Sequence, residues 1–314
     1  MIRINPARFI PATLIIITFL NGTKTPVFNI VPTPALSSPS HAVRSAASLS
    51  PHFIGQNKEP DFLITAKNVL VSDIKTNQPL FTRRADELVP VASLTKLMTA
   101  LVLLDRGINF DDEVRIFTND LRGGVPELLI PGEKVQVRDL WNLMLVASYN
   151  TAAAALVRHI GFSEDEFVRL MRDKANDLFL FEIEFADATG LSPANRASAR
   201  NITKLTRAAF GRFEIIKAAS LTNYEFATES FKNTKRLVTA QSTNLLLAVP
   251  LTDNDFEIVS GKTGYLDESK YNFVLQARQG DHDIIMTLLG SESKESRFEE
   301  AKNLADWIFN NYKW

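Results

Sequence analysis

Apolar residues alternate with polar ones in short runs near both ends of the chain, and they recur with a helical period in between. The stretch FLITAKNVLVSDIKTNQPLFTRRADE contains two β-branched, apolar runs around the turn signal KTNQP, which predicts a hairpin. Towards the C-terminus, FEIVSGKTGY, KYNFVLQARQ and HDIIMTLLG are separated by the short polar segments LDES and QGD. This spacing predicts three more strands, joined as an antiparallel meander.

The middle of the chain carries helix signals. A helix is expected to open at Ser93 and to close around DRG, with Gly107 as its C-cap. The segment 121–161 contains a turn, a helix, a break at SYN and an Ala-rich helix, and further helices are predicted across 163–179 and 199–213. The final segment predicts an amphipathic helix with these side chains on one side: Phe298, Leu304, Trp307 and Ile308.

Strands at both ends with helices between them imply one sheet built from distant parts of the chain. We expect an α/β (α+β) fold in which the first hairpin and the last three strands form an antiparallel sheet of about five strands. Terminal helices would flank this sheet, and the central helices would form an all-helical lobe against one edge. A functional site is expected in the cleft between the two parts.

The N-terminal residues predict export. Arg3 and Arg8 precede an apolar stretch, Phe9 to Leu20, that is too short for a spanning helix and suits a signal peptide at residues 1–22. A buried core helix is the alternative, which Pro11 and the polar residues that follow disfavour. No small-x-small cleavage site follows closely, so cleavage and retention as a membrane tether both stay open.

The domain organisation follows from composition. Residues 23–60 are rich in Pro and Ser and predict a linker, and residues 61–314 are expected to form the catalytic domain. We therefore expect an extracytoplasmic protein, on the periplasmic or cell-wall face of a membrane.

Charge and cysteine content exclude several functions. The 314 residues carry a formal net charge of -1, which predicts no nucleic-acid partner because no basic face is implied. The absence of Cys excludes disulfides and thiolate chemistry. The four His residues form no ligand pattern, so we expect no metal and no cofactor, and a Ser-His-Asp triad is disfavoured.

The motif S-x-x-K occurs three times, at Ser72, Ser93 and Ser291. On a helix, residues three apart share one face, so an amine can take a proton from a hydroxyl there. The structural alternative for Ser93 is a helix cap, with Lys96 on a solvated face. The Ser72 motif lies in a predicted strand and turn, where such residues point to opposite faces, which excludes it.

Two further motifs accompany S-x-x-K. K-T-G occurs once, at Lys262, Thr263 and Gly264, on a predicted strand. S-x-N occurs at Ser148 to Asn150, in the break between two helices, and at a second place, Ser242 to Asn244, that is more typical of a helix start.

The set Ser93/Lys96, Ser148/Asn150 and Lys262/Thr263/Gly264 resembles the active-serine motifs of penicillin-binding proteins and class A β-lactamases. The required order of the three motifs removes the S-x-x-K at Ser291. Longer blocks such as ATGLSPANRASARNITKL and SGKTGYLDESKYNFVLQARQGDHDIIMTLLGSESKESRFEEAKNLADWIF are similar to the D-alanyl-D-alanine carboxypeptidase family of low-molecular-mass penicillin-binding proteins, from about Ala66 onward.

The resemblance implies a β-lactamase/penicillin-binding-protein-like fold and a serine-type D-Ala-D-Ala carboxypeptidase, which trims peptidoglycan stem peptides by acyl transfer through a serine ester. Its partners would be peptidoglycan stem peptides as substrates and β-lactam antibiotics as covalent inhibitors. Ser93 would be the nucleophile, and Lys96 is expected to have a lowered pKa because of burial and the second cation, Lys262. Ser148 would pass a proton to the leaving amine, and Asn150 would hold Lys96 and the substrate amide. The identity of the base stays open.

Substrate binding is expected along the Lys262, Thr263 and Gly264 strand. The resemblance places the oxyanion between the backbone N–H groups of Ser93 and Tyr265. Arg297 matches the family arginine near the substrate carboxylate; its alternative is an ion pair with the neighbouring glutamates.

Several features depart from the family pattern. Tyr149 stands inside S-x-N, where Gly or Asp is usual, and is expected to narrow the cleft. Asn201 stands where Asp is common. The end at Trp314 makes the chain similar to the shorter members, some of which are endopeptidases.

Three other functions stay as alternatives: a cross-link endopeptidase, a β-lactamase and a catalytically silent wall-binding protein. The β-lactamase glutamate motif, E-x-x-L-N, is missing, so slow release of bound penicillin is expected.

Overall fold

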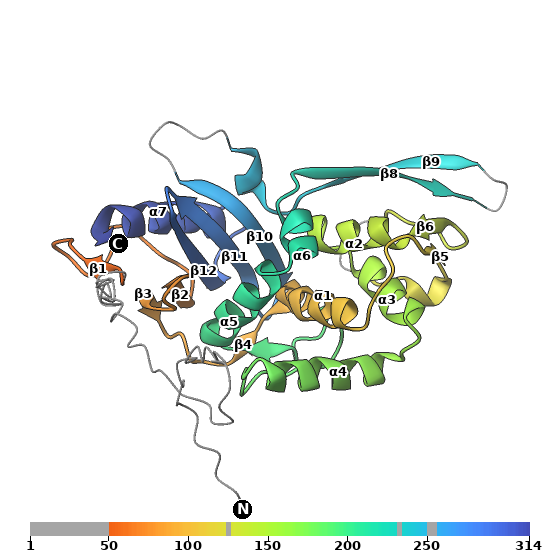
Figure 1. The fold of residues 1–314 in the computed structure, drawn as a ribbon, viewed down its shortest axis with the longest axis horizontal. Helices are drawn as coiled ribbons and strands as arrows, with labels where there is room; N and C mark the ends of the chain where they lie inside the picture. Colours follow the sequence, from red (N-terminus) through yellow and green to blue (C-terminus); the bar gives the residue numbers. More distant parts are fainter. Residues whose placement is uncertain (1–49, 124–126, 231–233, 250–255) are drawn as a thin grey trace, which may run out of the picture. The chain divides into compact units, whose positions relative to one another are not determined.

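The central sheet combines strands from the early and the late parts of the described chain. The computed structural model describes residues 50–123, 127–230, 234–249 and 256–314. Five antiparallel strands run in the order β10-β11-β12-β2-β3 (Figure 1). Their bounds are β2 Asn68–Asp73, β3 Pro79–Arg83, β10 Glu257–Leu266, β11 Lys270–Gln279 and β12 His282–Ser291. The predicted hairpin, meander and five-stranded sheet are confirmed.

Side chains alternate across this sheet and build a separate core on each face. Phe273 and Leu275 of β11 pack with the last helix, α7 (Ser296–Asn311), whereas Val274 faces the helical lobe. The predicted apolar side of α7 is confirmed, with Phe298 in the α7 core.

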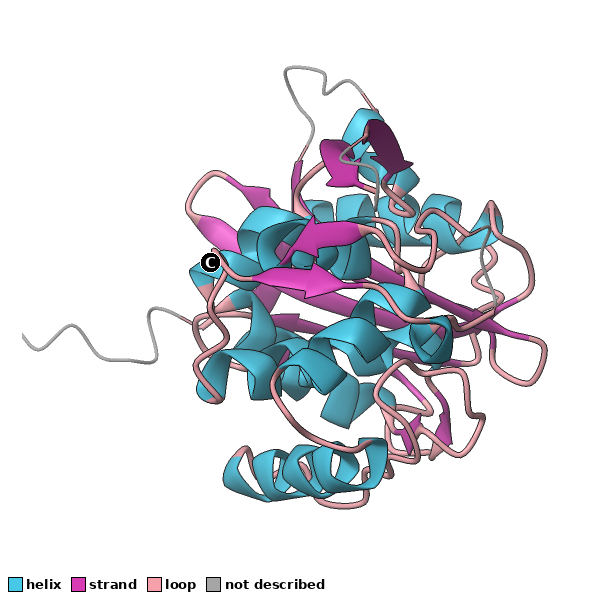
Figure 2. Cartoon of the chain, turned by 90° about the vertical axis from the view of Figure 1, so that its right-hand side faces the viewer, coloured by secondary structure: helices cyan, strands magenta, loops and turns pink. Residues whose placement is uncertain are grey.

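Six helices make up most of the second lobe. They are α1 Lys96–Asp105, α2 Val137–Val146, α3 Asn150–His159, α4 Glu164–Asp177, α5 Ala199–Phe210 and α6 Phe213–Ala219. A 3-10 turn at Ala92–Thr95 precedes α1, and Gly107, with φ 72°, follows its end. The break at SYN separates α2 from α3 as predicted, and α6 was not predicted. Figure 2 views the molecule from the side of this lobe.

The lobe is not all-helical, which corrects the prediction. It also holds a four-stranded sheet in the order β5-β6-β8-β9, made of β5 Glu113–Arg115, β6 Lys134–Gln136, β8 Asn223–Glu229 and β9 Lys235–Gln241. The long hairpin β8–β9 runs past α2 (Figure 1). Only two side chains of each hairpin strand are buried, such as Phe226 and Val238, so the apolar alternation is too weak to predict these strands.

Paired structure begins before Asp61, the expected start of the domain. Strand β1 (His52–Phe53) pairs with β13 (Tyr312–Lys313). A second short pair joins β4 (Val89–Pro90) to β7 (Arg196–Ala197), next to the turn that carries Ser93. The predicted signal segment, residues 1–22, and most of the expected linker lie outside the described residues. Within the described ranges, no helix is long and apolar enough to cross a membrane.

Candidate active site

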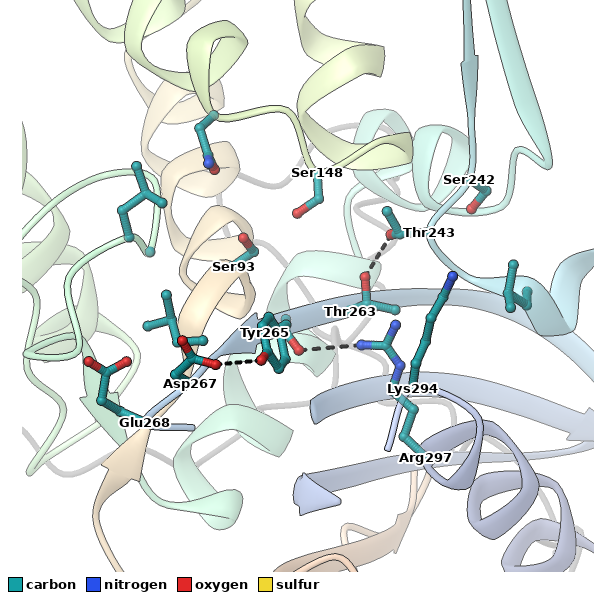
Figure 3. Close-up of a pocket in the computed structure, with 16 residues that line it drawn as sticks. Ser93, Ser148, Ser242, Thr243, Thr263, Tyr265, Asp267, Glu268, Lys294 and Arg297 are labelled. Atoms are coloured by element: carbon teal, nitrogen blue, oxygen red, sulfur yellow. Dashed lines mark hydrogen bonds between the residues drawn. The ribbon is translucent and has the colours of Figure 1, made fainter. Parts of the chain in front are cut away.

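A cleft of about 580 Å³ lies where the helical lobe meets strand β10. Ser93 enters it from the turn before α1, and Ser148 and Asn150 enter from the α2–α3 junction. Thr263 to Leu266 contribute one edge, and Arg297 reaches in from α7 (Figure 3). The tertiary structure therefore brings the three predicted motifs to one place.

The other motif copies do not form a second set of this kind among the described residues, although Ser242 and Lys294 also line the cleft. Ser72 is in β2, and Ser291 ends β12, where its Oγ donates to Glu300. Asn244 caps a 3-10 turn, Leu245–Ala248, by accepting from the N–H of Leu246, so the predicted helix start is confirmed.

Lys96 is buried and its amine has three oxygen neighbours. Nζ lies 3.0 Å from Ser93 Oγ, 2.6 Å from Asn150 Oδ1 and 2.5 Å from the carbonyl oxygen of Thr189. The Asn150 and Thr189 oxygens can only accept hydrogen bonds. Two hydrogens of a neutral amine satisfy them, which leaves the nitrogen lone pair for the Ser93 hydroxyl. Asn150 is held in this orientation because its Nδ2 donates to the carbonyl of Gly123, at 2.6 Å.

Burial makes the neutral form of Lys96 accessible. It lowers the pKa of the Lys96 ammonium to about 7, and the negative charge of Asp187 opposes this shift without cancelling it. The expected lowering by burial is confirmed. Burial, followed by the charges of Lys96 and Arg297, holds the pKa of Lys262 well below the ordinary lysine value. The two ammonium charges repel one another, so the protonation of both lysines at once is disfavoured.

Ser148 is paired with the second lysine. Lys262 Nζ donates to Ser148 Oγ at 2.6 Å and to the carbonyl of Thr263 at 2.9 Å, and its side chain is fully buried. The neighbouring hydroxyl, Thr263 Oγ1, donates to Thr243 Oγ1 at 2.6 Å (Figure 3). The hydroxyls of Ser148, Thr243 and Thr263 thus line the cleft with Ser93, and Lys262 is buried against Ser148.

The backbone is strained at or beside both serines of the cleft. Ala92, which precedes Ser93, has φ 51°, and Ser148 has φ 59°. Non-glycine residues rarely adopt this left-handed region, and it costs about 1–3 kcal/mol where it occurs. Gly264 lets β10 approach the turn that carries Ser93, because a Cβ there would lie 2.9 Å from the carbonyl oxygen of Val91 and 3.2 Å from Ser93 N.

Arg297 is buried in the cleft wall, and it has no carboxylate partner within the part of the chain that the structure describes. Its Nη1 donates to the carbonyls of Gly264 and Asn272, at 3.3 and 3.5 Å, and its Nε has no hydrogen-bond partner among the described residues. Burial lowers its pKa to about 10, so the guanidinium stays charged at neutral pH. No ion pair joins Arg297 to Glu295 or Glu299 among the described residues, although the charge of Glu295 opposes the lowering of the Arg297 pKa by burial.

Tyr149 does not narrow the cleft, which corrects that expectation. Its side chain is fully buried in the lobe, and its hydroxyl accepts from the backbone N–H groups of Leu128 and Leu129, at 2.9 and 3.1 Å. The same hydroxyl donates to the carboxylate of Glu127. The left-handed backbone of Ser148 turns the chain between the two residues, so Ser148 faces the cleft while Tyr149 faces the core.

Asp187 was missed by the sequence analysis. Its Oδ1 accepts from Thr189 N, Thr189 Oγ1 and Gly190 N at 2.6–2.7 Å, and its Oδ2 accepts from Ser192 N at 2.7 Å. Burial alone would raise its pKa, but these hydrogen bonds outweigh burial and hold the pKa below its ordinary value. The only signal was the turn-forming composition of ADATGLS, because Asp, Thr, Gly and Ser are typical of such loops. The loop presents the Thr189 carbonyl to Lys96.

Comparison with known proteins identifies a family of peptidases. A family model described as D-alanyl-D-alanine carboxypeptidase (peptidase S11) matches residues 55–293. A D-alanyl-D-alanine endopeptidase of Escherichia coli (strain K12) is 28% identical over 255 residues, covering 78% of this chain and 77% of that protein. The D-alanyl-D-alanine carboxypeptidase DacF of Bacillus subtilis (strain 168) is 29% identical over 257 residues, covering 79% of this chain and 63% of that protein.

A solved structure is similar over the same region. The crystal structure of the Streptomyces K15 DD-transpeptidase superimposes with a TM-score of 0.72 at 27% sequence identity, covering 80% of this chain and all of that one. The penicillin-binding-protein-like fold expected from the sequence is confirmed.

Proposed function

The chain belongs to the family of D-alanyl-D-alanine carboxypeptidases (peptidase S11), and we propose that it releases the terminal D-Ala of peptidoglycan stem peptides through an acyl-enzyme on Ser93. The observation that carries this proposal is the amine of Lys96, which lies 3.0 Å from Ser93 Oγ while its other two neighbours can only accept hydrogen bonds. A serine hydroxyl needs a base at neutral pH, and this amine is poised to be one.

Acylation begins when Ser93 Oγ attacks the carbonyl carbon of the penultimate D-Ala and its proton passes to the neutral amine of Lys96. The leaving nitrogen needs a proton when the C–N bond breaks. Ser148 supplies it and is reprotonated by the ammonium form of Lys262, whose Nζ lies 2.6 Å from Ser148 Oγ. The products are free D-Ala and an ester on Ser93, which water then hydrolyses. Hydrolysis of the ester later returns a proton from water to Lys262, and Lys96 returns its proton to Ser93.

The peptide binds beside β10 and its oxyanion is stabilised by backbone groups. We assign the oxyanion site to the N–H groups of Ser93 and Tyr265, which Gly264 allows to approach one another. The Lys262, Thr263 and Gly264 strand aligns the peptide by main-chain pairing.

Arg297 binds the carboxylate at the end of the substrate. Its guanidinium is charged, lines the cleft and lacks a carboxylate partner among the described residues, so an incoming carboxylate would satisfy a buried cation. β-Lactams that carry a carboxylate would use the same contact when they acylate Ser93.

Covalent labelling with fluorescent penicillin tests the assignment of Ser93. The wild-type protein should be labelled, and Ser93→Ala should not, although it stays folded by circular dichroism. Lys96→Ala should lose labelling nearly as completely, because groups of this kind act as a unit. Labelling of the Ser93→Ala protein at another single residue would remove Ser93 from the mechanism.

A cross-link endopeptidase is the second candidate, because relatives with that name align over about three quarters of their length. Release of free D-Ala from a pentapeptide, compared with cleavage of purified cross-linked dimers, separates the two activities. Faster cleavage of dimers would replace the carboxypeptidase assignment.

Peptidoglycan lies outside the cytoplasm, so we propose that residues 1–22 direct export or anchor the protein at the membrane. Alkaline phosphatase, which is active only outside the cytoplasm, can be fused after residue 60 to test this. An inactive fusion would contradict export, and fractionation of an active one distinguishes a cleaved signal from a retained anchor.

A further inference from the structure

Three consecutive residues at the start of α3 hold the same neighbouring segment of the lobe. The Tyr149 hydroxyl binds the Leu128 and Leu129 N–H groups and the Glu127 carboxylate. Asn150 Nδ2 donates to the carbonyl of Gly123, and Thr151 Oγ1 accepts from the N–H of Arg122 at 3.0 Å. The two ends of this segment are thereby attached to the S-x-N motif.

We propose that Tyr149 is a positioning residue, whose hydroxyl holds Ser148 and Asn150 in place against Lys262 and Lys96. This inference rests on the proposed roles of Ser148 and Asn150 in catalysis. It assigns a function to the middle residue of the motif, which makes no contact with the cleft.

The strained backbone of Ser148 explains why such an attachment is needed. Its φ of 59° costs about 1–3 kcal/mol and persists only where surrounding contacts fix it. On one side, the N–H of Tyr149 donates to the carbonyl of Leu143 at the end of α2, at 3.1 Å. On the other side, the Tyr149 side chain fixes the direction in which the chain leaves Ser148. Without the hydroxyl, the serine can relax toward an unstrained conformation and move its Oγ away from Lys262.

Tyr149 makes three hydrogen bonds through its hydroxyl, which a core residue that only fills space would not need. Burial, followed by the hydrogen bond with Glu127, raises the pKa of Tyr149, so its hydroxyl keeps its proton and donates it to the carboxylate. A phenylalanine would fill the same volume and lose all three hydrogen bonds. Tyr149→Phe therefore separates the positioning role from packing.

Tyr224 provides a matched control in the same lobe. Its hydroxyl donates to Asp139 Oδ1 at 2.7 Å, its ring stacks on Phe226, and it lies outside the catalytic cleft. Tyr224→Phe thus removes one hydroxyl that is bound to a carboxylate and leaves the S-x-N motif untouched.

The experiment measures the rate constant for acylation by penicillin, the affinity of the preceding reversible complex, and the melting temperature. Tyr149→Phe should acylate about ten- to a hundredfold more slowly, as expected for a small displacement of reacting groups, with the reversible affinity nearly unchanged. Tyr224→Phe should lower the melting temperature without slowing acylation. Equal slowing in both variants, or a Tyr149→Phe rate within twofold of wild type, would overturn the proposal.

Two additional comparisons make every outcome decisive. Ser148→Ala tests the proposed role of Ser148, which would be refuted if this variant were acylated at the wild-type rate. If Ser148→Ala is acylated slowly but Tyr149→Phe at the wild-type rate, only the inference about Tyr149 is refuted. If Tyr149→Phe does not fold, the exposed Glu127 replaces it. Glu127→Ala should then be slow and Glu127→Gln, which keeps an acceptor, should be close to wild type; wild-type rates in both would overturn the proposal.

Discussion

Acylation of Ser93 should depend on pH through the amine of Lys96. Burial lowers its pKa to about 7, so about half of the molecules hold a neutral amine at pH 7. The neutral fraction is about one in eleven at pH 6 and about one in a hundred at pH 5. Between pH 7 and pH 9 it rises only about twofold. A lysine with its ordinary pKa of about 10.4 would instead gain nearly a hundredfold over that interval.

The assay is the second-order rate constant for labelling by fluorescent penicillin, measured by rapid quenching between pH 5 and pH 10. We expect a slope of about one decade per pH unit below pH 6 and a plateau above pH 8. Circular dichroism at each pH separates loss of the base from loss of the fold. A rate that still rises tenfold per unit between pH 8 and pH 9 would refute a base whose pKa is lowered to about 7.

The Asp187→Asn variant extends this test. The carboxylate of Asp187 raises the pKa of Lys96 against the effect of burial, so removing its charge should move the midpoint of the pH profile to lower pH. The midpoint of the pH profile depends on the charge near Lys96. The rate on the plateau also falls if the loop that Asp187 organises becomes disordered. Asp139→Asn, in the same lobe and bonded to Tyr224, should leave the midpoint in place. Equal shifts in the two variants would contradict the role of Asp187.

Three other predictions concern the cleft. Arg297→Ala should lower kcat/KM on a pentapeptide by the equivalent of about 2–5 kcal/mol, because the desolvated substrate carboxylate loses its charged partner. The loss should be much smaller on the same pentapeptide with its C-terminal carboxylate converted to an amide, and equal losses would exclude the carboxylate role. The free energy of unfolding of Lys96→Met minus that of the wild type should be about 2.5 kcal/mol larger at pH 8 than at pH 10, as measured by chemical denaturation. Between pH 7 and 10.5 the Lys96 side chain is protonated in the unfolded chain and neutral in the folded protein, so the stability of the wild type rises with pH there. A difference between the two proteins that does not change with pH would mean that Lys96 is charged in the folded state. Gly264→Ala should slow acylation at least tenfold, since its Cβ would lie 2.9 Å from a backbone carbonyl, and unaltered labelling would show that β10 can move aside.

Local sequence patterns determined the five strands of the central sheet, most helices and the position of the S-x-x-K, S-x-N and K-T-G motifs. The period of two in residues such as Phe273 and Leu275 requires a strand with two faces, whatever packs on them. The same argument excluded the S-x-x-K at Ser72, because a strand cannot place both side chains together. Chain order and the resemblance then singled out Ser93, Ser148 and Lys262.

Only the tertiary structure decided what surrounds these residues. The pKa of Lys96 depends on burial by several helices and on Asp187, which belongs to a distant loop. The inward direction of Tyr149 depends on the partners that Glu127 to Leu129 offer, and the role of Arg297 depends on carbonyl groups from two strands. Side-chain direction, desolvation and long-range charge are properties of segments brought together by folding, so no local pattern encodes them.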